Sequence, residues 1–133
     1  MRAIRFATVL ILALVFSACA HGRTAGASAG KEAVTHVVVC WLKNPGNAED
    51  RERLIQAAKS LRPIPGVISL EAGECLPSNR EIVDSTFDVA MVIRFRDGKA
   101  LEEYLVNPIH VQAVKEHLVP LTSKVLIYDY HPH

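Results

Sequence analysis

Four segments of the chain show the two-residue alternation of side chains that is typical of β-strands. Each is rich in β-branched or aromatic residues and is bounded by turn-forming residues. The segments are residues 34–43, 67–76, 87–95 and 125–130. Between the first and second segments, and between the third and fourth, apolar residues recur instead with the period of a helix.

The first strand segment, VTHVVVCWLK, is apolar on both of its alternating faces. One face carries His36, Val38 and Cys40, and the other carries Val37 and Val39. A strand that is apolar on both sides is expected to be covered on both sides.

The helical segments have recognisable start and stop signals. The first helix is expected to begin after Asn47, a good N-cap residue, and to end at the Pro-Ile-Pro-Gly segment 63–66. A second helix begins after Asp97. Pro108 breaks this helix, because proline disfavours helical backbone at Asn107, and it suits the first turn of a further helix.

The order of elements is therefore strand, helix, strand, strand, broken helix, strand, which predicts an α+β, ferredoxin-like split βαβ fold. The expected four-stranded antiparallel sheet has its helices on one face, so the other face needs a second cover. A second copy of the chain would supply it, giving a homodimer whose two sheets enclose an α/β-barrel interior. With the third strand between the first two, Cys40 and Cys75 would lie roughly 10 Å apart, which predicts two free, buried thiols.

The first residues of the chain differ from the rest. Arg2 and Arg5 precede the apolar run 7–16 and a group of small residues that includes Cys19. This pattern predicts an export signal over residues 1–19, of the lipoprotein type, with Cys19 lipidated. The alternative is ordinary cleavage after residue 20. We expect a protein exported to the periplasmic or cell-envelope face of a bacterial membrane and lipid-anchored there, or, in the alternative, a soluble secreted one.

Residues 20–33 are rich in Gly, Ala, Ser and Thr and are expected to form a flexible tether, which leaves one domain at 34–133. Without Arg2 and Arg5, 13 of the 15 basic residues remain against 14 acidic ones. Since no basic stripe remains, nucleic acid is not an expected partner.

Several motifs of the domain occur together in one order. They are the His36 strand start, the Ile-Pro-Gly of residues 64–66, the Phe-x-Asp of 95–97 and the Tyr-x-x-Asn-Pro-x-His of 104–110. In these motifs and in their order, the chain resembles the stress-responsive α/β-barrel (Dabb) family over nearly the whole domain. The resemblance implies a ferredoxin-like subunit that pairs into a barrel dimer. Some plant relatives are polyketide cyclases; Tyr104 and His110 match their tyrosine and histidine, while a second cyclase tyrosine falls near Ala57, which has no hydroxyl.

Tyr104, His110 and His36 can each have a chemical role or a structural one. In an enzyme, His110 would be the general base and Tyr104 would stabilise the developing negative charge on oxygen. Otherwise His110 ties the helix break together through backbone carbonyls, and Tyr104 is a core aromatic. His36 either lines the barrel and contacts a ligand, or is a core histidine with one partner. The spacing of the histidines predicts no metal site.

We therefore expect a homodimer that binds a small apolar molecule in the barrel, in a cavity near Tyr104 and His110, without a cofactor. One alternative is a cofactor-free cyclase that uses these two residues. The other is a structural or stress-protective protein with a fully packed interior.

Overall fold

The computed structural model describes residues 33–133. The predicted export signal, the lipidation site Cys19 and nearly all of the predicted tether lie outside these residues. Ala33, assigned above to the tether, is buried, and its carbonyl accepts a hydrogen bond from Nδ1 of His131 at 3.1 Å. In the described part of the chain, no helix is long and apolar enough to span a bilayer.

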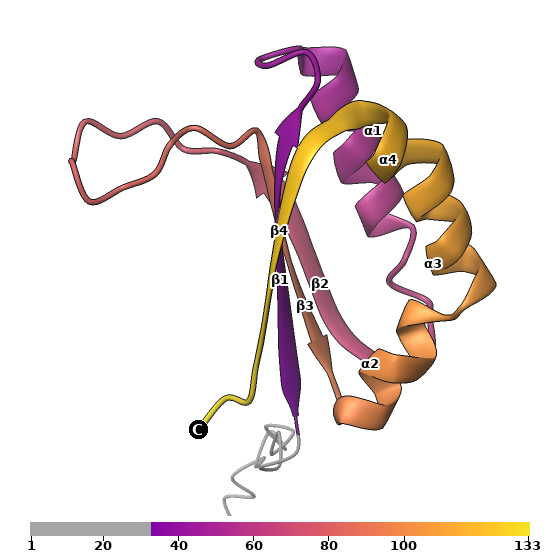
Figure 1. Cartoon of the computed structure of the whole chain (residues 1–133). Helices are drawn as coiled ribbons and strands as arrows, with labels where there is room; N and C mark the ends of the chain where they lie inside the picture. Colours follow the sequence, from indigo (N-terminus) through magenta and orange to yellow (C-terminus); the bar gives the residue numbers. More distant parts are fainter. Residues whose placement is uncertain (1–32) are drawn as a thin grey trace, which may run out of the picture.

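A single antiparallel sheet of four strands forms one layer of the domain (Figure 1). The strands are β1 (Val34–Leu42), β2 (Val67–Glu74), β3 (Val89–Phe95) and β4 (Thr122–Tyr130). Their order across the sheet is β2-β3-β1-β4, so β3 lies between the parallel pair β1 and β2, as predicted. The ferredoxin-like fold expected from the order of elements is confirmed.

The helices all lie on one side of this sheet (Figure 1). They are α1 (Ala48–Lys59), α2 (Gly98–Leu105), α3 (Pro108–Ala113), the π-helix η1 (Val114–Leu118) and α4 (Val119–Leu121). The predicted caps are present: the side chain of Asn47 accepts from the amide of Asp50, and that of Asp97 from the amide of Ala100. The last three helical segments follow one another directly, and their middle part is the π-helix.

The hydrophobic core lies between the sheet and the helices. Both Val38 and Cys40 of β1 are buried there, as are Ile93 and Phe95 of β3. The helices close this core mainly with α1, whose buried residues are Leu54, Ile55 and Ala58.

The opposite face of the sheet has no helix over it, yet it is largely apolar. Val37 of β1 pairs with Val92 of β3 on one side and with Tyr128 of β4 on the other. A second row comprises Ala90, Val39 and Leu126. Val92 is 38 % exposed and Tyr128 57 % exposed. The connection between β2 and β3 extends past this open face, away from the helices (Figure 1).

The cysteines are placed as the strand order predicted. Both are free, and Cys40 is buried in β1. The expected burial of Cys75 is wrong: this residue is half-buried, because it follows the end of β2 at Glu74. Burial raises the pKa of the Cys40 thiol to about 12.

Candidate functional site

The helix break at Asn107 and Pro108 brings two proton-bearing side chains together. Asn107 is extended, with φ −64° and ψ 132°, and its side chain caps α3 by accepting from the amide of Ile109 at 3.0 Å. Because α2 ends before this break and α3 starts at Pro108, the chain turns within two residues. As a result His110, in the first turn of α3, lies against Tyr104 of α2.

Tyr104 lies at the centre of a group of rings. Its ring centroid is 4.4 Å from that of His110 and 4.8 Å from that of Phe95. The residue is only 1 % exposed, and burial raises the pKa of its hydroxyl. The phenol therefore stays protonated at neutral pH and can donate a hydrogen bond.

His110 is held by the backbone of the preceding helix. Its Nδ1 lies 3.1 Å from the carbonyl oxygen of Leu105. Since a carbonyl can only accept, Nδ1 carries the hydrogen, and in the neutral ring Nε2 has the free lone pair. Partial burial lowers the pKa of His110, as does the charge of His36 to a smaller extent, while the bond to Leu105 raises it. The net decrease favours the neutral ring, in which Nε2 can accept a proton.

His36 of β1 lies on the sheet side of this group of rings. It is buried, and its Nδ1 lies 2.6 Å from Oδ1 of Asp129, its cross-strand partner on β4. The ring meets those of Phe95 and Tyr104 edge-on, at centroid distances of 6.3 and 6.4 Å. Asp129 thus fixes the orientation of His36 beneath Tyr104. The sequence analysis did not select Asp129; the register of β1 against β4 is the information it lacked.

These positions correct one expectation. The sequence analysis placed the cavity near Tyr104 and His110 inside a barrel enclosed by two sheets, and left His36 either as a barrel-lining group or as a core histidine with one partner. In the structure all three side chains lie on the helix-covered face, and His36 is a buried histidine with Asp129 as its partner. The strand pattern showed which residues share a face of β1, but both faces are apolar, so it did not show which one the helices cover.

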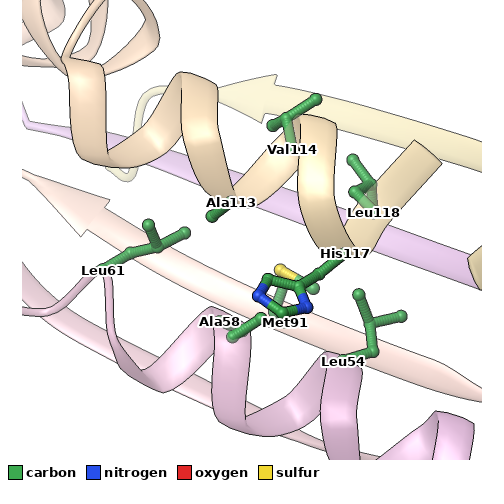
Figure 2. A pocket seen from close by; sticks show the side chains of 9 residues that line it. Leu54, Ala58, Leu61, Met91, Ala113, Val114, His117 and Leu118 are labelled. Carbon is green, nitrogen blue, oxygen red and sulfur yellow. The ribbon is translucent and has the colours of Figure 1, made fainter. Parts of the chain in front are cut away.

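An apolar cavity of about 40 Å³ lies further along the same layer, between α1, β3 and η1 (Figure 2). It is lined by Leu54, Ala57, Ala58, Leu61, Met91, Ala113, Val114, His117 and Leu118. Ala57 lies near the position at which the resemblance to the plant cyclases implies a tyrosine. Its small side chain contributes space to the cavity, and the wall there has no hydroxyl.

The arrangement has the groups for proton transfer or for holding a polar atom of a ligand. It provides a neutral imidazole, a protonated phenol and a histidine oriented by a carboxylate. Among residues 33–133 there is no group of three or more His, Cys, Asp or Glu side chains that could hold a metal ion.

The fold and these residues define a ferredoxin-like α+β domain with a histidine–tyrosine site on its helix-covered face. The sequence profile of the stress responsive A/B barrel domain, Dabb, matches residues 34–132. The chain therefore belongs to this family. No match was found among curated proteins.

Solved structures share the fold. A Dabb family protein with a ferredoxin-like fold from Mesorhizobium loti is 29 % identical, with a TM-score of 0.63 over 77 % of this chain and 98 % of its own. A dimeric ferredoxin-like protein of unknown function from Thermobifida fusca is 17 % identical, with a TM-score of 0.64 over 76 % and 92 %. The hydroxynitrile lyase of Passiflora edulis is 20 % identical, with a TM-score of 0.68 over 78 % and 96 %.

Proposed function

We propose that each subunit binds a small, largely apolar molecule in the layer between the sheet and the helices. The observation that carries this proposal is the apolar cavity between α1, β3 and η1, whose walls include the core residues Leu54 and Met91.

Native mass spectrometry of the protein purified from its own host tests this proposal. We expect a retained small molecule, seen as a mass increment that disappears on denaturation. Ala57→Leu fills the cavity from α1 and should abolish the increment. Ala48→Leu, the same change at an exposed position of the same helix, should keep it. An increment that survives Ala57→Leu, or a wild-type protein that carries no molecule and binds none, contradicts the proposal and favours a purely structural role.

A second candidate function is cofactor-free carbon-acid chemistry of the cyclase type. It is supported by the bond from His110 to Leu105, which leaves Nε2 as the basic atom next to the buried phenol of Tyr104. In such a reaction Nε2 takes a proton from a carbon beside a carbonyl, and the carbanion forms a bond to a second carbonyl of the same molecule. The proton then returns to the resulting alkoxide.

Turnover of a polyketide-like substrate tests this candidate. Turnover that disappears in His110→Ala, while the fold and subunit number persist, supports it. Equal turnover in the wild type and the variant would refute the role of His110.

The proposal includes a homodimer formed through the open face of the sheet. Support comes from the two apolar rows across that face, and from related folds described as dimeric. Light scattering after gel filtration should give twice the subunit mass. Val92→Glu on the open face should yield monomers, whereas Val119→Glu, at an exposed apolar residue on the helical side, should not. A wild-type monomer at micromolar concentration would refute the dimer.

Export with a lipid anchor at Cys19 is also part of the proposal. It is supported by the basic, apolar and small-residue pattern of residues 1–19. The mass of the mature N-terminus distinguishes the two forms: a diacylglyceryl-modified Cys19 supports the anchor, and a free His21 supports ordinary secretion.

A further inference from the structure

The apolar cavity has one polar wall residue, His117 of η1. Eight of its nine lining residues are apolar. Figure 2 shows the imidazole reaching from the helix into the space between η1 and α1, close to Ala58 and Met91. Its Nδ1 is buried, and no donor or acceptor of residues 33–133 pairs with it. Buried polar nitrogens are normally hydrogen-bonded, so this atom lacks a partner that a bound molecule would supply.

Water is a poor candidate for that partner. A space of about 40 Å³ has room for roughly three water molecules, but each buried water needs two to four polar partners. The walls offer only the imidazole. A ligand with one polar group and an apolar remainder fits the walls better.

A surface groove adjoins the cavity. It has a volume of about 210 Å³ and is lined by Ser60, Ile109, Gln112, Ala113, Glu116 and His117. Ala113 and His117 line both spaces, so the imidazole forms part of the wall between them. A molecule with one end in the cavity and the rest in the groove would pass His117, where its polar group would meet the imidazole.

The local backbone is unusual at this point. The amide of Val119 donates to the carbonyl of Val114, the five-residue step of a π-turn. Such turns are rare, and they are frequently found at functional sites. Here the π-turn contains His117, so the unusual backbone and the unpaired nitrogen coincide.

From these observations we propose that the cavity and groove bind a small neutral alcohol or phenol, whose hydroxyl pairs with Nδ1 of His117. A hydroxyl both donates and accepts, so it suits either tautomer of the ring. A carboxylate is disfavoured because Glu116 lines the groove. This inference rests on the proposed binding of a small apolar molecule, and it adds the ligand class and the recognising residue.

The methyl group of Met91 offers a direct readout. The chain has two methionines, Met1 and Met91, and Met91 lines the cavity. With methyl-labelled methionine in the full chain, the signal missing from Met91→Leu is that of Met91. Ethanol and propane are matched probes of the size that the cavity admits, because they differ only by a hydroxyl in place of a methyl. Titration of each, followed by the Met91 signal, gives two dissociation constants and their ratio.

We expect both probes to shift the Met91 signal, and His117→Leu to lower the preference for ethanol over propane by roughly five- to tenfold. His117→Gln, which keeps a donor and an acceptor, should restore much of that preference. Ala57→Leu should weaken both probes. If the ratio is the same in the wild type and His117→Leu, the role of His117 is refuted while the binding cavity stands. If neither probe shifts Met91, both the inference and the proposed cavity fail.

Discussion

Two histidines on one continuous helical segment should respond in opposite directions to the same substitution. His110 donates through Nδ1 to the carbonyl of Leu105 and stacks against Tyr104. His117, seven residues later, holds a buried Nδ1 without a partner among the described residues. We therefore expect His110→Leu to lower the free energy of unfolding and His117→Leu to raise it.

The magnitudes follow from the contacts. His110→Leu removes one hydrogen bond, worth about 1 kcal/mol net, and a ring contact worth about 0.5–1.5 kcal/mol, so a loss of about 2 kcal/mol is expected. His117→Leu removes an unpaired polar group and places an apolar side chain against apolar walls. A gain of about 1 kcal/mol is expected, the lower end of the cost of an unsatisfied buried group. Both variants gain the same helix propensity, so it cancels in the comparison.

Urea unfolding followed by the fluorescence of Trp41, the only tryptophan, measures both changes. Since the proposed dimer would make stability depend on concentration, all proteins are compared at one subunit concentration. A gap of about 3 kcal/mol between the two variants is expected. Equal losses in both would refute the reasoning, because His117 would then be a satisfied structural residue.

Other predictions concern the backbone, the pH dependence and the thiol. Gly66→Ala should lower the free energy of unfolding in urea by about 2–3 kcal/mol, because φ at this residue is +92° and the new Cβ would lie 2.6 Å from that of Ala100. Gly46→Ala should lower it by only about 1 kcal/mol, because φ is +76° but the space around this residue is open. Equal losses in the two variants would contradict this explanation. Because the pKa of His110 is lowered in the folded protein, this side chain binds a proton more readily in the unfolded chain. The free energy of unfolding should therefore fall as the pH drops below 6.5, and it should fall less in His110→Leu. Cys40, with its thiol pKa raised to about 12, should not react with Ellman's reagent at pH 8 until the protein unfolds. The Cys75→Ser variant removes the other thiol of the domain, so rapid reaction of this variant in its folded state would contradict the burial of Cys40.

Much of the fold could be predicted because its signals are local. Prolines and caps fixed the helix ends, and the order of elements fixed the order of strands, from which the separation of Cys40 and Cys75 followed. The break at Asn107 could be predicted for the same reason, since proline constrains its own residue and the one before it.

The candidate site was less accessible from the sequence. Tyr104, His110 and His36 do lie together, but the pattern of β1 did not show which face they share, because β1 is apolar on both sides. Asp129 needed the strand register, which depends on contacts far apart in the chain. The π-turn has no clear sequence signal, so a regular helix was expected where the backbone instead directs His117 towards α1.

The cavity lies on the helix-covered side of the sheet, as do His36, Tyr104 and His110, away from the face proposed to join the dimer. In a dimer joined through the opposite face of the sheet, the two sites would load independently. The saturation curve should then be hyperbolic, with one molecule per chain, and a monomeric Val92→Glu variant should keep the wild-type affinity.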